Sequence, residues 1–374
     1  MRSQDIVVVG AGVIGASSAW RLAQGGHTVT MIGDPQASPA SDVAAGMLAP
    51  VTEVEFGNEK LLELNLASSR MYGGFVEDLT DAVGLDVGYR QCGTLMVARD
   101  DDDRRALDEV FEFQRRLGLE VNRMSSQEIR NREPVLSPRV RGGIWVDGDH
   151  QIDPSALLAA LIAAGEAAGV SSLQDRVVDV VPGAGGAEVR TGSGLRLSCD
   201  TVVLAAGSYT GTIGGSGRLS IPVRPVKGQL VHLRARAGIP LPGANIRGLD
   251  VYVVTRADGR VVVGASVEEQ GFDKTLTAGA VHDLLRDAYE LWPGVVELEF
   301  SGVTAGLRPA TPDNAPVIGV LEDHVIVATG HFRNGVLLAP VTAATVVELV
   351  NGGSPASIAG FDPHRFAASA EVAR

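Results

Sequence analysis

The sequence predicts a two-lobed α/β protein, in which one lobe is built on a parallel sheet and the other on a mostly antiparallel sheet. The first observation is size: 374 residues exceed what one hydrophobic core usually serves, and 45% hydrophobic residues can fill two cores. The second is a strand–helix–strand pattern that opens at Ile6. The third is a change to longer, alternating strands after Pro222.

The N-terminal pattern is typical of a βαβ unit. Residues 6–9 form a short β-branched run, as in a strand buried on both faces of a parallel sheet. Residues 13–24 carry apolar groups at helical spacing up to a pair of glycines, and residues 28–32 predict the second strand. The same stretch imitates a signal peptide, but Arg21 interrupts it well short of the roughly 20 apolar residues of a membrane helix. We therefore expect no targeting segment.

The remaining elements divide the chain between the two lobes. Helices are predicted over residues 61–83, 101–117, 152–168 and 279–291, and a last helix reaches Val350. Strands are predicted over residues 93–98, 177–181, 187–190, 195–197, 201–205, 229–234, 251–255, 260–264 and 324–328. We expect a discontinuous nucleotide-binding lobe of residues 1–84, 147–220 and 307–374. The substrate lobe would comprise residues 85–146 and 221–306.

Composition and charge disfavour several classes of function. The 45 acidic and 32 basic residues give a net charge of -13, so we expect neither a nucleic acid nor a membrane as partner. Cys92 and Cys199 match neither a disulfide framework nor a metal-ligand spacing, which favours a reducing cytoplasm. The seven histidines form no metal-binding spacing, and the sequence contains no GxSxG motif, which disfavours a hydrolase. We expect no metal.

The first strand and helix are joined by a GxGxxG motif made of Gly10, Gly12 and Gly15. Glycines permit the tight turn there and let the backbone approach a pyrophosphate, while the helix N-terminus at Val13 and Ile14 adds unpaired N–H donors. This context predicts a Rossmann-type dinucleotide site rather than a mere glycine-rich turn.

A carboxylate is expected at the end of the second strand, where it would accept the ribose hydroxyl groups. Gly33 directly follows the predicted strand, and the carboxylate comes one position later as Asp34. Either the strand bulges or the ribose is held differently. We assign the role to Asp34.

Three further segments bear on whether the dinucleotide is NAD or FAD. In the stretch 40–50, small residues would let the main chain lie against a flat ring, and Met47 could cover one face, although an ordinary loop with a core methionine is the alternative. Another strand end, at residues 205–208, is also rich in small residues. Pro340 predicts a helix that begins between Asn334 and Ala339, whose N-terminus could stabilise negative charge on a reduced flavin.

Six segments together resemble one known family. They are VVVGAGVIGASSAWRL, AAGMLAP, RPVKGQL, YVVTRADGRVVVGAS, GLRPATPDNAPVIG and GHFRNGVLLAP. The sequence resembles in them the D-amino-acid oxidase superfamily of FAD-dependent oxidoreductases, and within it the glycine oxidase family. The resemblance covers nearly the whole chain, and GMLAP and GHFRNGVLLAP are its most discriminating pieces.

The resemblance implies roles for individual residues. Arg308 would bind the substrate carboxylate, for which a guanidinium fork is suited, and the Tyr252 hydroxyl would share it. Arg333 would line substrate and flavin, Met47 would lie beside the ring, and Val267 falls where the family lines the pocket with an apolar side chain. Without the motifs, both arginines would be assigned to salt bridges and Tyr252 to the core.

The resemblance also implies the residues that bind FAD. No cysteine follows Cys199, so a covalent link near the C-terminal motif is not expected and FAD would be noncovalent. The expected contacts are Gly10, Gly12, Val13, Ile14, Gly15, Asp34, Ser41, Ala45, Gly46, Met47, Val177, Gly207, Arg308, His331, Phe332, Arg333, Asn334, Gly335, Val336 and Leu337.

The implied reaction is oxidative deamination of glycine or another small amine, by hydride transfer from Cα to flavin N5. It would yield an imine, then glyoxylate and ammonia, with hydrogen peroxide from oxygen. The family further implies a homo-oligomer and the delivery of the imine to a thiazole synthase for thiamine. Open alternatives are a D-amino-acid or sarcosine oxidase, a dehydrogenase that reduces a quinone, a non-catalytic flavin-holding subunit, and an NAD dehydrogenase.

Overall fold

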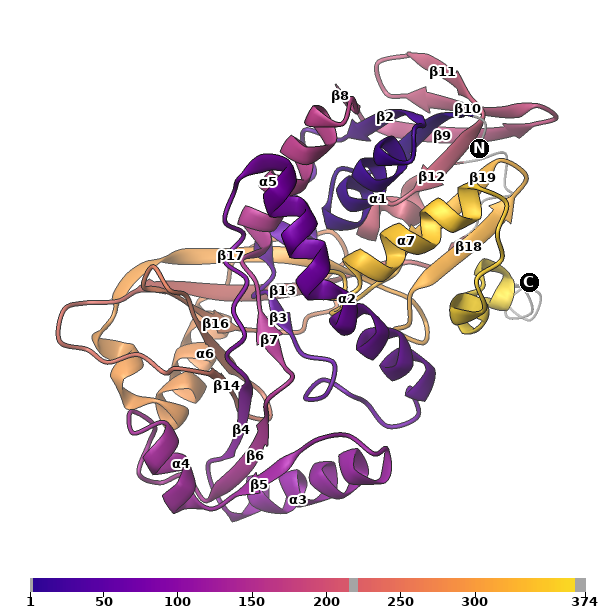
Figure 1. The fold of residues 1–374 in the computed structure, drawn as a ribbon. Coiled ribbons are helices and arrows are strands. Elements are labelled where there is room, and N and C mark those ends of the chain that lie inside the picture. The colour runs from indigo at the N-terminus through magenta and orange to yellow at the C-terminus, as the bar shows by residue number, and fades with distance from the viewer. Residues whose placement is uncertain (1–2, 215–220, 367–374) are drawn as a thin grey trace.

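The computed structural model describes residues 3–214 and 221–366, which form two lobes (Figure 1). One lobe contains a six-stranded sheet in the order β18-β19-β12-β1-β2-β8, and the other an eight-stranded sheet in the order β17-β13-β16-β15-β14-β4-β6-β5. The predicted fold class, a parallel sheet beside a mostly antiparallel one, is confirmed.

The six-stranded sheet is parallel except at one edge. Its parallel strands are β1 (Asp5–Val9), β2 (Thr28–Gly33), β8 (Ser171–Gln174), β12 (Thr201–Leu204) and β19 (Val325–Thr329), and β18 (Val317–Glu322) pairs antiparallel with β19. The parallel order β2-β1-β12-β19 brings the carboxyl ends of distant segments to one edge of the sheet. This edge is where a parallel sheet binds its ligand.

Both faces of the parallel sheet are covered, which explains why β1 is apolar at successive positions. Ile6 and Val8 pack in a core with helices α1 (Val13–Gln24), α5 (Pro154–Ala167) and α7 (Ala339–Val350). Val7 and Val9 pack on the other face with a three-stranded sheet of β9 (Val177–Gly183), β10 (Gly186–Thr191) and β11 (Arg196–Cys199). A strand that is buried on both faces does not alternate between apolar and polar residues.

The eight-stranded sheet is antiparallel except between β14 and β4. Its strands are β4 (Thr94–Ala98), β5 (Asn122–Met124), β6 (Gly142–Val146), β13 (Arg224–Arg234), β14 (Asn245–Arg247), β15 (Tyr252–Thr255), β16 (Arg260–Gly264) and β17 (Glu299–Ala310). Helix α6 (Ala278–Leu291) packs on one face of it through Leu284, Ala288 and Leu291. Helices α3 (Asp101–Arg116) and α4 (Ser126–Arg132) lie at the β4, β5 and β6 end.

Two connections bring the lobes together. The long ribbon of β13 and β17 pairs from Arg224 with Ala310 to Arg234 with Glu299, and one end of it reaches the first lobe (Figure 1). The short strand β3 (Met47–Leu48) pairs with β7 (His150–Gln151), and Gln151 also forms a β-bridge with Arg90 of the second lobe. Helix α2 (Glu59–Val83) packs against α5 and α7 of the first lobe. No helix within residues 3–214 and 221–366 is long and apolar enough to cross a membrane.

Most differences from the predicted elements have local causes. The predicted strand 93–98 begins at Thr94 because Gly93 has a φ of +70°. The helix predicted over residues 152–168 begins at Pro154 with Asp153 as its cap, as the Asp153-Pro154 pair predicts, and the predicted strand 195–197 is shifted to Arg196–Cys199. The strand β17 was not predicted, since Gly302, Gly306 and Pro309 interrupt its pattern. The predicted lobe boundaries, which extend into residues outside the described ranges, stay a prediction.

Candidate active site

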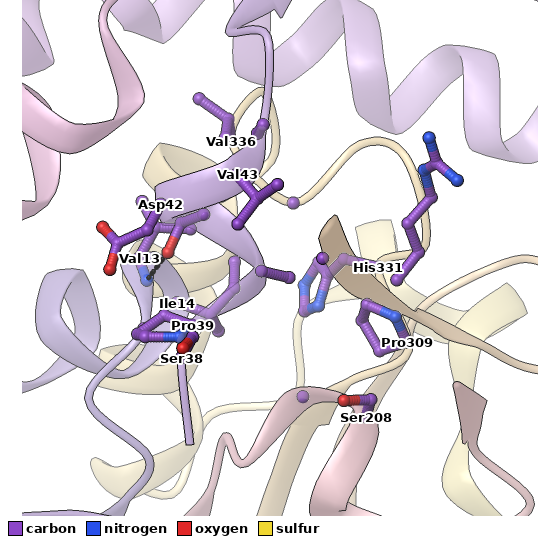
Figure 2. A pocket seen from close by; sticks show the side chains of 18 of the residues that line it. Val13, Ile14, Ser38, Pro39, Asp42, Val43, Ser208, Pro309, His331 and Val336 are labelled. Carbon is purple, nitrogen blue, oxygen red and sulfur yellow. Dashed lines mark hydrogen bonds between the residues drawn. The ribbon is translucent and has the colours of Figure 1, made fainter. Parts of the chain in front are cut away.

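A cavity of about 820 Å³ opens between the two lobes, at the carboxyl edge of the parallel sheet. Figure 2 shows Val13 and Ile14 on one side of it and His331 and Pro309 on the other. Its wall also includes Arg308 and Tyr252 of the eight-stranded sheet. A cavity of this size between lobes is typical of a site for a large cofactor and a small substrate.

The three motif glycines serve different purposes. A Cβ added at Gly10, whose φ is +113°, would lie 2.3 Å from the Ala205 oxygen. One added at Gly15 would lie 1.8 Å from the Gly10 oxygen, so both glycines are needed for the turn itself. At Gly12, the nearest atoms would be 3.8 Å away and the cavity begins. The structure therefore leaves open, at Gly12, the space that a pyrophosphate needs beside the start of α1.

The second strand shows no bulge before its carboxylate. β2 stays in regular register with β1 and β8 and includes Gly33. A Cβ added at Gly33 would lie 2.9 Å from the Ala11 Cβ, which explains why the strand ends on a glycine. Asp34 then lines the cavity, and its carboxylate accepts the Gln36 N–H at 2.8 Å. The regular pairing excludes a bulge in the strand, yet Asp34 still reaches the cavity from one position beyond the strand end, so its role at the ribose stays a prediction.

The loop from Ala40 to Met47 forms another wall of the cavity. It opens with the short helix η1 (Ala40–Val43), in which the buried Ser41 hydroxyl accepts the Val13 N–H at 3.4 Å (Figure 2). Gly46 has a φ of +78°, and an added Cβ there would lie 2.0 Å from the Ile152 oxygen. Met47 is then held by the pairing of β3 with β7 and lines the cavity. The loop packs tightly against Ile152 on the side away from the cavity, so its accessible side is the side toward the cavity.

Arg308 and Tyr252 each lie over a glycine of the neighbouring strand. An added Cβ at Gly228 would lie 2.3 Å from Nη2 of Arg308 and 2.4 Å from its Cζ. One added at Gly264 would lie 2.5 Å from the Tyr252 hydroxyl oxygen. The segments RPVKGQL and VVVGAS therefore supply flat strand surfaces on which the two polar side chains rest. No pattern in the sequence indicates this arrangement, because it depends on the strand register.

The guanidinium of Arg308 is paired only with neutral groups. Its Nη1 donates to the main-chain oxygens of Ser266 at 3.0 Å and Lys227 at 3.3 Å. Within the described ranges, no carboxylate lies in salt-bridge distance of it. Burial lowers the pKa of Arg308, with the charge of Arg333 acting in the same direction. A desolvated cation that faces a cavity without a counter-ion is a binding group for an anion.

Tyr252 stays protonated in this surrounding. Burial raises the pKa of its hydroxyl to about 12, against the smaller opposing effect of Arg308. The hydroxyl therefore remains a hydrogen-bond donor at neutral pH. Donor groups from Tyr252 and Arg308 converge on one part of the cavity wall, as carboxylate binding requires.

Two ion pairs at the cavity wall were not predicted from the sequence. Arg247, which lies opposite Tyr252 in the register of β14 and β15, pairs with Glu53 at 2.6 Å, and both side chains are largely buried. Arg333 lies 3.7 Å from Glu55 and is partly exposed. Arg333 thus has a carboxylate partner, as its alternative assignment to a salt bridge requires, whereas Arg308 has no carboxylate partner among the described residues.

The C-terminal motif lies where the cavity meets the last parallel strand, but not all of it faces the cavity. His331, Phe332, Arg333, Gly335 and Val336 line the cavity. Helix α7 begins at Ala339, within the predicted limits. Burial lowers the pKa of His331 to about 3, and its Nε2 lies 3.1 Å from the Thr342 hydroxyl, so this ring is neutral at working pH.

Two expected contacts in that motif do not line the cavity. Leu337 is buried in the core, and its carbonyl accepts a hydrogen bond from Ser68 at 2.6 Å. Asn334 faces a smaller neighbouring hollow, and its main chain continues the turn through the Leu338 N–H. Gly15, the third glycine of the GxGxxG motif, does not line the cavity either, whereas the remaining expected contacts, including Val177 and Gly207, do. Val267 also lines it, with 55% of its surface exposed.

Comparisons with known proteins agree with this geometry. Residues 5–349 match the family model described as FAD dependent oxidoreductase. The glycine oxidase of Geobacillus kaustophilus is 32% identical over 352 residues, which are 92% of this chain and 92% of the relative. The crystal structure of glycine oxidase from that organism superposes with a TM-score of 0.91 at 31% identity, covering 98% of this chain and 99% of the other.

Two further proteins show the range of the similarity. The bifunctional protein ThiO/ThiG of a Synechocystis species is 35% identical over 375 residues, which are 97% of this chain but 54% of the relative. The chain therefore spans about half the length of this relative. The crystal structure of an iminodiacetate oxidase from a Chelativorans species has a TM-score of 0.87 at 25% identity, covering 96% of this chain and 98% of the other.

Proposed function

This chain belongs to the DAO family of FAD-dependent oxidoreductases, and we propose that it oxidises glycine as an amine oxidase with bound FAD. The observation that carries the choice of substrate is Arg308: a guanidinium at the cavity wall, held by two main-chain oxygens, without a carboxylate partner among the described residues. A small amino acid would supply the missing carboxylate.

The carboxylate of the substrate would bind to Arg308 and Tyr252 together. The guanidinium presents two parallel N–H groups that match the two oxygens of a carboxylate, and the Tyr252 hydroxyl adds a third donor. Hydrogen bonds to charged groups contribute about 1.5–3 kcal/mol each, and more when water is excluded. Three such donors suffice to orient a substrate that has few other atoms to hold.

The residues that would hold FAD fit its parts. The open space at Gly12 and the start of α1 suit the pyrophosphate, Asp34 suits the ribose hydroxyl groups, and the loop at Gly46 and Met47 suits the flat ring. We propose that the binding is noncovalent. FAD, when bound, supplies the acceptor for the hydride from Cα, and oxygen then takes the electrons as hydrogen peroxide.

The protein itself would orient the substrate rather than exchange a proton with it. His331 is neutral and buried against Thr342, and Tyr252 keeps its proton, so neither accepts a proton from the amine at neutral pH. The neutral amine of the substrate provides the electron push, and the two carboxylate-binding groups fix Cα in place. The imine that leaves the site would hydrolyse to glyoxylate and ammonia.

We further propose the pathway and the organisation of the chain from its relatives. The match to about half of the bifunctional protein ThiO/ThiG supports delivery of the imine to a thiazole synthase, in the formation of thiamine, and a homo-oligomer is proposed from the same resemblance. The lobe boundaries at residues 84, 146, 220 and 306 are proposed as domain boundaries. D-Amino acids and sarcosine, the N-methyl derivative of glycine, are the competing substrates.

Oxygen consumption with glycine, sarcosine and D-alanine tests this proposal. Purified protein loaded with FAD is expected to consume oxygen with glycine at a higher kcat/KM than with the other two, and to form ammonia, glyoxylate and peroxide in equal amounts. A higher value for sarcosine or D-alanine would replace glycine as the substrate. Oxygen consumption with none of the three would overturn the proposal.

A further inference from the structure

Arg256 is a buried arginine whose surroundings the reaction described above leaves unexplained. It directly follows β15, the strand that begins with Tyr252, and only 7% of its surface is exposed. Its Nη1 donates to the Gln151 side-chain oxygen at 2.7 Å, and its Nη2 donates to the Ala45 main-chain oxygen. The side chain thus passes from the substrate lobe to the back of the loop that lines the cavity.

The partners of Arg256 are uncharged, which is uncommon for a buried cation. Within residues 3–214 and 221–366, no carboxylate lies in salt-bridge distance of it, whereas the buried Lys227 pairs with Glu268 at 2.7 Å. Burial lowers the pKa of Arg256 to about 10, so it keeps its charge at neutral pH. Desolvating a charge without a counter-ion costs several kcal/mol, and a role in fold stability alone would be met by an ion pair or an apolar side chain.

Two separate contacts fix the directions of two successive peptide groups in the loop. Arg256 holds the Ala45 carbonyl, and the Ile152 N–H donates to the Gly46 carbonyl at 2.9 Å. The C=O and N–H of a trans peptide point in opposite directions, so the N–H groups of Gly46 and Met47 point away from these partners. The Gly46 N–H has no acceptor among the residues that the structure describes. Ala45, Gly46 and Met47 all line the cavity.

We propose that Arg256 is a positioning residue of the flavin site, which aims the N–H groups of Gly46 and Met47 at the flavin ring. It also places behind this loop a positive charge that has no carboxylate in salt-bridge distance among the described residues. This inference rests on the proposed placement of the ring beside Met47. A positive charge behind the loop favours the reduced, negatively charged ring over the oxidised, neutral one, because the two are separated by protein of low polarity rather than by water. Arg256 thereby raises the potential at which the site accepts two electrons.

Gln151 couples the cation to the rest of the loop. It is 1% exposed, lies opposite Met47 in the pairing of β3 with β7, and donates through Nε2 to the Thr255 oxygen at 3.1 Å. Its side-chain oxygen is the second acceptor of Arg256. Replacing this amide by a carboxylate would neutralise the buried charge without removing the guanidinium from Ala45.

The test separates charge from geometry with four variants. Arg256→Gln removes the charge, Arg256→Lys keeps it with fewer hydrogen bonds, and Gln151→Glu compensates it. Arg234→Gln, at an exposed position on β13, two strands away from β15 in the same sheet, is the matched control. For each, we would measure the FAD dissociation constant and the midpoint potential of the bound flavin, neither of which involves glycine.

The expected results follow from the two proposed effects of Arg256, the orientation of the loop N–H groups and the positive charge. In Arg256→Gln, the affinity for reduced relative to oxidised FAD falls at least about tenfold, which lowers the two-electron potential by about 30 mV. Gln151→Glu lowers the potential in the same direction, whereas Arg256→Lys and Arg234→Gln leave it near the wild-type value. The FAD dissociation constant rises in both Arg256 variants and is unchanged in the control.

A wild-type potential and a wild-type FAD dissociation constant in Arg256→Gln would overturn the inference, even with glycine still oxidised. If Arg256→Gln does not fold, Gln151→Glu and Arg256→Lys decide: a potential unchanged in the first, or lowered equally in the second, overturns the role of the charge. If the potentials shift as predicted but the wild-type protein does not oxidise glycine, the proposed substrate is refuted and the role of Arg256 stands.

Discussion

The replacement Gly228→Ala tests whether the position of Arg308 matters, without touching Arg308 itself. A methyl group at residue 228 would lie 2.3 Å from Nη2 of Arg308, whereas ordinary contacts begin near 3.4 Å, so the guanidinium must move by about 1 Å. The backbone tolerates alanine there, since Gly228 lies in the regular register of β13, opposite Gly306. The clash is with the mobile end of a side chain, so the fold can absorb it.

The expected loss is large in catalysis and small in stability. A misplacement of about 1 Å can reduce kcat/KM by about 10²-fold, which is about 2.7 kcal/mol of transition-state binding. The cost in unfolding free energy is about 1–2 kcal/mol, because Arg308 gives up its hydrogen bonds to the Ser266 and Lys227 oxygens. FAD affinity is expected to stay within about twofold of wild type.

The assay combines turnover with a binding measurement that needs no turnover. The kcat/KM for glycine is measured by oxygen uptake, and the dissociation constant of acetate, a carboxylate without an amine, is measured from the spectrum of bound oxidised FAD. Both are expected to worsen together. Gly279→Ala, which places its methyl in open space on α6, is the control and should change neither. A kcat/KM and an acetate affinity at wild-type levels in Gly228→Ala would refute the assignment of Arg308 to the carboxylate.

The remaining predictions concern the substrate groups, the glycine turn and the buried carboxylate. Arg308→Met should cost about 2–5 kcal/mol of transition-state binding for glycine, and Tyr252→Phe about 1.5–3 kcal/mol, each seen as a lower kcat/KM. Oxygen-uptake kinetics on folded, FAD-loaded variants check both predictions, and a loss of kcat/KM below twofold in either variant removes that residue from the site. Gly12→Ala should leave the unfolding free energy of FAD-free protein unchanged yet raise the FAD dissociation constant at least about tenfold, whereas Gly15→Ala should fail to fold, since its methyl meets the Gly10 oxygen at 1.8 Å. Chemical denaturation and FAD titration distinguish the two variants, and equal behaviour of both would contradict the roles assigned to the two glycines. Burial raises the pKa of Asp149 from 3.8 to about 6, so its contribution to stability is full below about pH 4 and is lost as pH rises through about 6. Unfolding free energies of wild type and Asp149→Asn should therefore change relative to each other by about 2 kcal/mol between about pH 4 and pH 8, in favour of the variant at high pH, and a constant difference would show that Asp149 does not titrate there.

The sequence predicted the nucleotide-binding lobe because its determinants are local. The glycines at 10, 12 and 15 lie between a β-branched run and an amphipathic helix, and that order alone defines the turn, the helix and the sheet edge. The position of helix α7 followed from Pro340 for the same reason, since a proline restricts where a helix can begin.

The features that depend on strand register could not be predicted. Nothing in the residues around Gly228 and Gly264 reveals that Arg308 and Tyr252 lie over them, because each contact joins two strands that are separated in the chain. The pairing of Glu53 with Arg247 joins the two lobes in the same way. Leu337 is expected at the flavin because it belongs to a discriminating motif; the turn before α7 directs its side chain into the core, so only its main chain is left for such a contact.

Reduction of the bound flavin by glycine without oxygen tests the central claim most directly. The protein loaded with FAD would be titrated anaerobically with glycine while the absorbance of the oxidised flavin at about 450 nm is followed. We predict that this absorbance is lost at saturating glycine and returns, with peroxide, when air is admitted. A flavin that stays oxidised in saturating glycine, in protein that binds FAD fully, would contradict the proposed substrate.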